Sequence, residues 1–163
     1  QAEAESGALS GGFVVVNPDP AASNMQSAKL PNTTVVGGVD LFGTSFSPPS
    51  GTYQLLVRMK CTTATSATAQ MQIGIWDPTA GAYVASVTFA PNGVTTTYQW
   101  YKAGLAALPV GHATQFRAGN TATCTDDWFI DEAVLVQVTG SGSGPQDLAT
   151  QFLFDRTNKL RLA

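Results

Sequence analysis

The sequence predicts an all-β fold in which two antiparallel sheets pack as a sandwich. About eight to ten short segments, rich in β-branched and aromatic residues, recur at regular spacing with turn residues between them. No convincing amphipathic helix interrupts this pattern over residues 1–138. The last segment, WFIDEAVLVQV at residues 128–138, alternates in polarity as a half-buried strand does. Together these three observations predict one β-sandwich domain.

The remaining elements follow in chain order. After QAEAE and a Gly/Ser turn, FVVVN is expected to form a short buried strand, and residues 17–32, with three prolines, a long surface loop. TTVVGGVDLFGTSF indicates one or two strands broken by its paired glycines. Residues 53–60 alternate cleanly, which predicts a strand with one solvent-facing side. Turn-rich sequences such as DPTAGA and APNGV separate the other predicted strands, at residues 71–76, 83–89, 98–102 and 113–118.

Asp131 lies in the middle of the closing segment, between residues expected to be buried. The face predicted to point into the core is nearly all apolar: Trp128, Ile130, Glu132, Val134, Val136 and Val138. A buried carboxylate is costly unless a cation pairs with it, and no Lys or Arg lies nearby in sequence. Glu3 and Glu5 would share one face of an extended first strand. If first and last strands meet, the three acids require a hard cation, for which calcium is the natural candidate.

Six short motifs occur in an order and spacing that point to a known family. They are AEAE near the start, SGG at 10–12, GTYQLLVRMK at 51–60, YQWY at 98–101, LPVG at 108–111 and FIDEAVL at 129–135. In these motifs the chain resembles the calcium-bearing β-sandwich carbohydrate-binding modules, the jelly-roll type appended to polysaccharide-degrading enzymes. The resemblance covers roughly residues 1–138. It implies a jelly-roll fold, a glycan partner and a structural calcium held by Glu3, Glu5 and Asp131.

Glycan binding requires an aromatic face for the sugar ring and a few polar groups for its hydroxyls. Trp76 and Tyr83 flank a turn and are expected to be exposed. The resemblance also implies ligand contacts from the loop before the last strand, residues 119–127. Core packing is the alternative for each aromatic side chain, and it is favoured for Trp100 and Trp128. The candidate ligand-binding residues are Trp76, Tyr83, Asn120, Asp126, Asp127 and Trp128.

The composition is typical of a secreted or surface-displayed β-protein. Charged residues make up 12% of the chain, against about 25% in an average globular domain. The net charge of -3 gives no electrostatic basis for nucleic-acid binding. No apolar run approaches the roughly 20 residues of a membrane span, so no membrane insertion is expected.

Cys61 and Cys124 are too far apart in sequence to suggest a metal site. They could be buried free thiols or a disulfide. We expect the disulfide, because both lie at strand–loop junctions and the composition indicates an oxidising compartment. Such a bond would close a loop of about 60 residues, worth roughly 4 kcal/mol in the chain-entropy model.

No catalytic constellation is found in the sequence. His112 is the only histidine, which leaves no multi-histidine metal site, and neither a phosphate-binding glycine loop nor a nucleophile elbow occurs. Asp126 and Asp127 are adjacent in a loop, where neighbouring side chains point apart, so they make a poor acid–base pair. The chain is therefore predicted to be non-catalytic.

The character of the chain changes after residue 138. Residues 139–146 have the composition of a flexible linker, and residues 147–163 are apolar, with alternation typical of a small hairpin. A helix capped at Asp147 is the less favoured alternative for this tail. This tail either docks on a sheet edge of this domain or of another copy, or begins a neighbouring domain. The sequence thus favours an extracellular carbohydrate-binding module. The alternative is a structural sandwich subunit of a virion, tail fibre or extracellular filament, whose tail docks on a neighbour.

Overall fold

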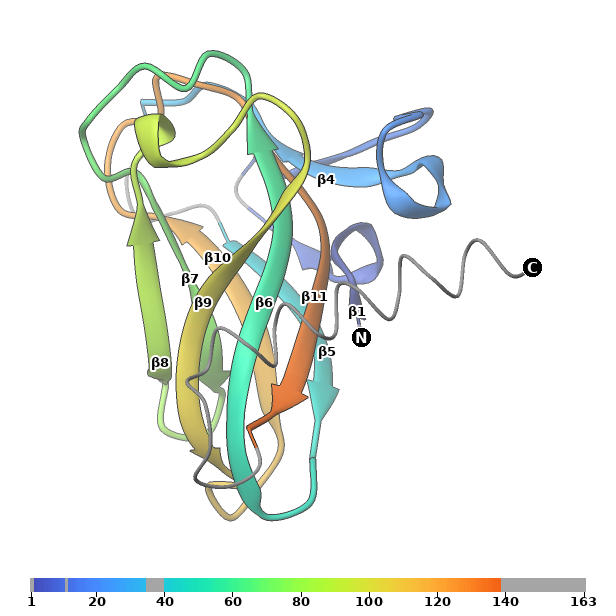
Figure 1. Cartoon of the computed structure of the whole chain (residues 1–163), viewed down its shortest axis with the longest axis vertical. Coiled ribbons are helices and arrows are strands. Elements are labelled where there is room, and N and C mark those ends of the chain that lie inside the picture. Colours follow the sequence, from blue (N-terminus) through green and yellow to red (C-terminus); the bar gives the residue numbers. More distant parts are fainter. Residues whose placement is uncertain (1, 11, 35–39, 139–163) are drawn as a thin grey trace.

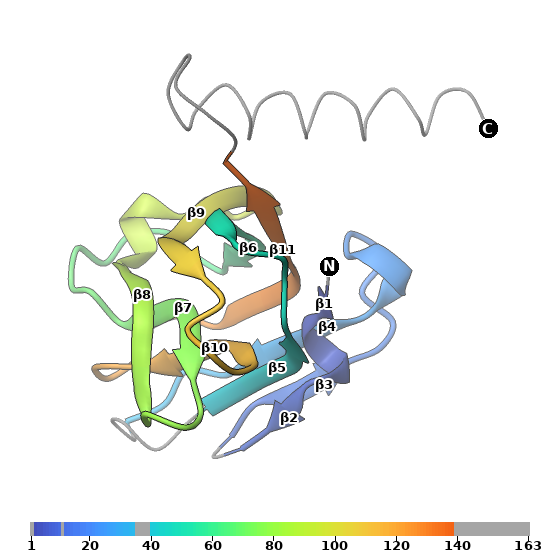
Figure 2. The same cartoon turned by 90° about the horizontal axis from the view of Figure 1, so that it is seen from below.

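A computed structural model describes residues 2–10, 12–34 and 40–138 as two packed antiparallel sheets (Figures 1 and 2). The first sheet has the order β3-β4-β11-β6-β9, with β1 also paired to β11. Its strands are β1 (Ala2–Glu3), β3 (Val14–Val16), β4 (Ser27–Leu30), β6 (Gly51–Cys61), β9 (Gln99–Leu108) and β11 (Trp128–Gln137). The second sheet, in the order β2-β5-β10-β7-β8, comprises β2 (Ala8–Leu9), β5 (Asp40–Phe46), β7 (Met71–Asp77), β8 (Ala82–Phe89) and β10 (Thr114–Asn120).

Within the described residues, three single-turn 3₁₀ helices lie outside the sheets: η1 (Ala4–Ser6), η2 (Ser23–Met25) and η3 (Pro91–Gly93). No helix in the described ranges has the length and apolarity to cross a membrane. The predicted sandwich is confirmed. The predictions for the linker and the C-terminal tail concern residues 139–163, which lie outside the described residues.

The first and last strands meet, as the sequence predicts. Ala2 and Glu3 of β1 pair with Ala133 and Glu132 of β11. The chain then turns through η1 and enters the second sheet as β2, which pairs with β5. The N-terminal segment therefore connects the two sheets along one side of the sandwich. The expectation that Glu3 and Glu5 share a strand face is wrong, because β1 ends at Glu3 and Glu5 lies in the η1 turn.

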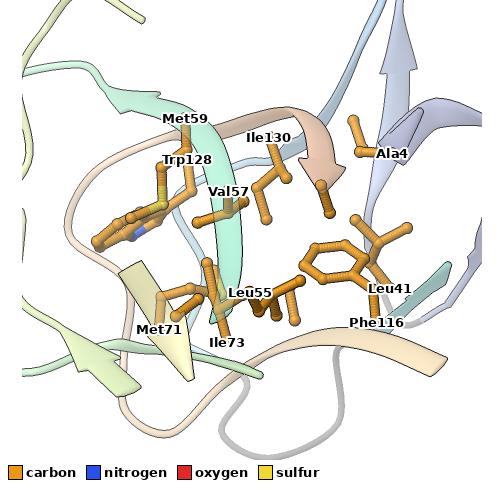
Figure 3. Packing of buried hydrophobic residues seen from close by; sticks show 14 of the residues in the cluster. Ala4, Leu41, Leu55, Val57, Met59, Met71, Ile73, Phe116, Trp128 and Ile130 are labelled. Atoms are coloured by element: carbon orange, nitrogen blue, oxygen red, sulfur yellow. The ribbon is translucent and has the colours of Figure 1, made fainter. Parts of the chain in front are cut away.

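The core fills the space between the sheets (Figure 3). Strand β6 shows the predicted alternation: Tyr53, Leu55, Val57 and Met59 all belong to the core cluster. From the second sheet, Phe116 and the apolar residues of β7 meet them. The opposite side of β6 is less exposed to solvent than expected, since Gln54 and Leu56 are also buried. Gln54 is satisfied there by donating hydrogen bonds to the carbonyls of Leu55 and Gly104.

A β-bulge at Asp131 changes which side of β11 faces the core. The pairing of β11 with β6 shifts register between Ile130 and Glu132, so one extra residue is inserted there. Trp128 and Ile130 point into the core as predicted, but after the bulge Ala133 and Leu135 take over this role. The prediction that residues 132, 134 and 136 continue the core face is therefore wrong. A single inserted residue reverses every later side chain of a strand.

Two further expectations are corrected. Residues 17–32 are not one surface loop, because they include strand β4, whose Ala28 and Leu30 are fully buried. The predicted disulfide is not formed: Cys61 and Cys124 are both free and buried. Cys61 Sγ lies 3.5 Å from the carbonyl oxygen of Pro91, whereas Cys124 pairs through its backbone with Thr33. Burial raises the pKa of Cys61 and raises that of Cys124 to about 11, so both thiols stay protonated at neutral pH.

Candidate glycan-binding face and acidic N-terminal site

The two aromatic residues expected to be exposed lie together on the outer face of the second sheet. Trp76 on β7 pairs with Tyr83 on β8, and both side chains are half-buried. Their ring centroids are 5.1 Å apart at an interplanar angle of 79°, an edge-to-face arrangement. Trp76 points outward because β7 alternates: Met71, Ile73 and Ile75 fill the core on its other side.

Arg117 completes this aromatic group from β10, the neighbouring strand. Its guanidinium carbon lies 4.0 Å from the centroid of the Trp76 ring and 5.3 Å from that of Tyr83, which are cation–π distances. Phe116 before it points into the core, so alternation directs Arg117 outward. Sequence reasoning missed Arg117, because only the pairing of β10 with β7 brings it beside Trp76.

Amide and hydroxyl groups continue the same outer face. Gln72 donates a hydrogen bond of 2.8 Å to Ser86 across β7 and β8. Gln115, which is directly opposite Trp76, donates one of 3.2 Å to Ser45 on β5. We refer to this set as the Trp76 face: Gln72, Trp76, Tyr83, Ser86, Gln115 and Arg117.

The turn between Trp76 and Tyr83 is held by Asp77. Its carboxylate accepts hydrogen bonds from the backbone N–H groups of Ala80 at 2.9 Å and Thr79 at 2.8 Å. His112 Nε2 lies 2.6 Å from the same carboxylate oxygen. The backbone bond from Ala80, helped by His112, holds the pKa of Asp77 below its ordinary value. These contacts fix the geometry of the turn and with it the separation of the two aromatic rings.

The other predicted ligand-binding residues do not join the Trp76 face. Asn120 pairs with Met71 at one end of β10, whereas Gln115 pairs with Trp76 near the other end. Asn120 is buried, and its side-chain amide donates to the carbonyl of Ala122. The predicted site is thus divided between the two ends of the sandwich.

Three of the predicted ligand residues have structural roles. Trp128 has no exposed surface and belongs to the core, as its alternative interpretation held. Asp126 is buried and accepts hydrogen bonds from the backbone N–H and hydroxyl of Thr63. Asp127 forms an ion pair of 2.7 Å with Lys29. Asp126 and Asp127 thus tie neighbouring loops to the sheet, and their role in ligand binding stays a prediction.

Asp131 has a cationic partner that its sequence neighbourhood does not reveal. Its carboxylate is fully buried and forms an ion pair with Arg58 on the adjacent strand β6. The same carboxylate accepts hydrogen bonds from Ser23 in η2, at 2.9 Å from its backbone N–H and 2.6 Å from its hydroxyl. Part of the charge compensation expected from a metal therefore comes from the protein itself.

The surrounding acids still leave negative charge to be balanced. The hydroxyl of Ser23 lies 2.7 Å from Glu3 Oε2 as well as close to Asp131, although it carries one proton for the two carboxylates. Glu5 Oε2 is buried, with no hydrogen-bond partner in the described part of the chain. Burial, together with the charges of Glu3 and Asp131, raises the pKa of Glu5. The oxygen-rich, negatively charged surroundings fit a hard cation such as calcium.

These acids nevertheless do not form a ready-made metal cage. Among residues 2–10, 12–34 and 40–138, no three His, Cys, Asp or Glu side chains converge closely enough to hold a metal ion. The ion pair of Asp131 with Arg58 is one physical reason, because it engages an oxygen that a metal would otherwise use. Metal binding here requires the side chains of Glu3, Glu5 and Asp131 to rearrange.

The loop that carries Ser23 is anchored by Asp19. The Asp19 carboxylate accepts hydrogen bonds from the hydroxyls of Tyr98 at 2.6 Å and Ser27 at 2.8 Å, with the ammonium of Lys60 at 3.7 Å. Burial opposes ionisation of Asp19, but the bonds from Tyr98 and Ser27 and the charge of Lys60 outweigh it and lower its pKa.

Replacing Asp19 by Asn should therefore change how stability depends on pH. A carboxyl whose pKa is depressed by folding stabilises the native state above its unfolded pKa, and that contribution is lost as pH falls through its folded pKa. We expect Asp19→Asn to lower the Tm at pH 7 and to make the melting temperature less sensitive to acid below about pH 4. Thermal melts of both proteins from neutral to acid pH measure this, and parallel Tm curves would contradict the assignment.

Comparisons with known proteins agree with the fold. No protein-family model matches the sequence, and a search of curated protein sequences returns no significant match. Among solved structures, the chain is similar to a Podospora anserina GH26-CBM35 β-(1,4)-mannanase, with a TM-score of 0.59 and 14% identity. That match covers 86% of this chain and 28% of the mannanase, so the chain spans under a third of that enzyme.

Two carbohydrate-binding modules match over most of their own length. The C-terminal CBM6 of LamC, a marine laminarinase from Zobellia galactanivorans, has a TM-score of 0.51 at 18% identity, covering 83% of this chain and 97% of the module. TmCBM61, solved in complex with β-1,4-galactotriose, has a TM-score of 0.51 at 15% identity, covering 83% of this chain and 91% of the module. The chain thus has the β-sandwich fold of carbohydrate-binding modules.

Proposed function

We propose that this domain is a non-catalytic carbohydrate-binding module that binds a glycan on the Trp76 face. The observation that supports this most is the half-exposed group of Trp76 and Tyr83 with the Arg117 guanidinium against their rings. Aromatic rings provide the apolar surface that packs on the C–H groups of a sugar. Guanidinium and amide groups donate hydrogen bonds to hydroxyl or carboxylate oxygens. The fold shared with carbohydrate-binding modules is consistent with this role.

A flat sheet face suits an extended glycan better than a single sugar. The Trp76 face spans three neighbouring strands, β8, β7 and β10, so its polar groups lie beside the aromatic pair on β10 and further along β7 and β8. Such a surface can contact several successive sugar units of a chain. A sugar polymer of this kind would be met outside the cell or at a surface, which is the location that the composition favours.

Affinity electrophoresis in gels containing soluble polysaccharides tests this proposal. We expect the migration of the full chain to be retarded by at least one polysaccharide, and Trp76→Ala to weaken that binding by about tenfold to a hundredfold, since the indole supplies most of the stacking surface. Trp100→Ala is the matched control, because Trp100 is also half-buried but lies on β9 of the opposite sheet. Retardation that depends on Trp100 and not on Trp76 would place the site on the wrong sheet for this proposal.

We also propose that Glu3, Glu5 and Asp131 hold a structural calcium ion. The support is the surplus of carboxylates around η1 and η2, together with the buried oxygen of Glu5. A bound calcium would neutralise these acids and fasten the N-terminal segment to β11. The proposed role is structural, because the acids lie beside the first sheet, whereas the Trp76 face belongs to the second sheet.

Thermal melts with calcium and with a chelator test the metal proposal. A ligand that binds only the native state stabilises it by about 2.7 kcal/mol at a hundred times its Kd. The raised pKa of Glu5 adds a pH signature. Without metal, its neutral form is favoured, so stability is lost as pH rises through the folded pKa. Calcium should therefore raise the Tm more at pH 7 than at pH 4, because its ligands must be ionised. Identical melting curves with calcium and chelator at pH 7 would reject the site.

A further inference from the structure

On one side of the sandwich, the N-terminal segment connects the two sheets over only part of their length. β1 covers the edge of β11 at Glu132 and Ala133, and β2 covers the edge of β5 at Leu41 and Phe42. Further along, residues 134–137 and 43–46 have no partner strand on this side within the described ranges. Figure 2 shows the N-terminal segment lying between the edges of the two sheets. Both sheets therefore present unpaired backbone groups beyond it.

An apolar pocket of about 330 Å³ lies between these two edges. The β5–β6 turn closes one end of it. Leu55 and Phe116 are fully buried, whereas Phe46 and Leu135 are partly exposed. The apolar side chains that line the pocket from both sheets are Phe46, Tyr53, Leu55, Phe116, Ala133 and Leu135, and Ser45, Ser47, Pro48 and Pro49 line the rest of it. Because unpaired strand edges border an apolar pocket, an extended peptide with aromatic side chains matches this site better than a small polar ligand.

We propose that residues 147–163 of the same chain fill this pocket with an aromatic side chain and add a strand to the unpaired edge of β11. The segment carries six large apolar residues: Leu148, Phe152, Leu153, Phe154, Leu160 and Leu162. Phe152 and Phe154 are two residues apart, so in an extended strand both side chains point to the same face. That spacing matches an edge strand that inserts aromatic side chains between two sheets.

The connection between β11 and this segment is long enough for a reversal of direction. β11 ends at Gln137, at the end of its own unpaired edge. Residues 139–146 can span at most about 27 Å when extended, whereas residues 133–137 of β11 cover about 14 Å. A strand that follows this linker can therefore run back along β11, as in a hairpin. The same chain supplies the segment at a fixed short distance, which favours it over a second copy.

Hydrogen exchange of the full chain, followed by mass spectrometry, tests the proposal. We expect slowed exchange in residues 147–163 and in residues 134–137. Replacing both phenylalanines, as Phe152→Ser with Phe154→Ser, should speed exchange at residues 134–137 by about tenfold or more, because the added strand is lost. The matched control is Val14→Ser with Val15→Ser, which removes two exposed apolar side chains (47% and 46%) from strand β3. This control should leave residues 134–137 unchanged.

A second variant changes the pocket and leaves the tail intact. Leu135→Thr introduces a β-branched residue, which suits a strand, but makes the pocket more polar, and it should speed exchange throughout residues 147–163. The proposal is overturned if residues 147–163 of the wild-type chain exchange as an unfolded peptide does, or if Leu135→Thr leaves a protected tail unchanged. The molar mass from light scattering distinguishes a tail of the same chain from that of a second copy. If the wild type is a dimer and the double phenylalanine variant is a monomer, a second copy provides the segment and the proposal is wrong.

Discussion

With a chelator present, an Arg58→Ala variant is expected to lose about 3 kcal/mol of folding free energy, since it leaves a buried carboxylate without its cation. Asp131 is fully buried, and Arg58 is the cation paired with it in the described structure. The remaining bonds from Ser23 satisfy hydrogen-bonding capacity but not charge. Glu132, which pairs with Arg58 across the two strands, adds a second acid nearby. Urea denaturation of the variant and the wild type measures the difference.

Lys29→Ala is the matched control for this experiment. It also removes a cation from an ion pair of the first sheet, but Lys29 and Asp127 are each 26% exposed. Such an exposed pair is worth about 0.2–1 kcal/mol. The double variant Arg58→Ala with Asp131→Asn should recover part of the loss, because the unpaired charge is gone. Equal small losses in Arg58→Ala and Lys29→Ala would mean that Asp131 obtains its compensation elsewhere.

A Gly74→Ala variant is expected to lose about 3 kcal/mol or more, or to fail to fold, because a methyl group has no space there. A Cβ at this position would lie 2.2 Å from the carbonyl oxygen of Ala85 and 2.6 Å from the Cβ of Ser86. The nearest atom belongs to the backbone of β8, which cannot move aside without breaking its pairing with β7. Because Trp76 follows on the same strand, the distortion should also disturb the aromatic pair.

Gly93→Ala provides the comparison, since a Cβ there meets no atom within 4 Å. Its stability in the same urea series should stay within about 0.5 kcal/mol of the wild type. If Gly74→Ala were as stable as Gly93→Ala, the close approach of β7 and β8 described here would be wrong.

The fold could be predicted because hydrophobic alternation is a local property of the sequence. Residues 53–60 have a regular period, and in the structure their apolar face lies in the core as expected. The pairing of first and last strands could be anticipated from the acids at both ends of the domain. The bulge at Asp131 could not be predicted. Residues 132–138 could place either of their two alternating sets in the core, and only the pairing with β6 determines which set it is.

The candidate sites were harder to predict because they depend on contacts between distant residues. Trp76 and Tyr83 flank a short turn, so their proximity is visible in the sequence. Arg117 reaches Trp76 only through the register of β10 with β7, and Arg58 reaches Asp131 only through that of β6 with β11. The cysteines show the same limit. Their positions at strand ends suggested a bond, but the structure directs their sulfur atoms toward different carbonyl groups.

Glycan binding on the Trp76 face can be followed through the indole N–H signals of the chain. The sequence contains three tryptophans: Trp76 on the proposed face, Trp100 on the opposite sheet and Trp128 in the core. In a ¹H–¹⁵N NMR titration with oligosaccharides of a retained polysaccharide, the Trp76 signal should shift until saturation while the Trp128 signal stays in place. A saturable shift of the Trp100 signal with the Trp76 signal unmoved would place the glycan on the opposite sheet and rule out binding on the Trp76 face.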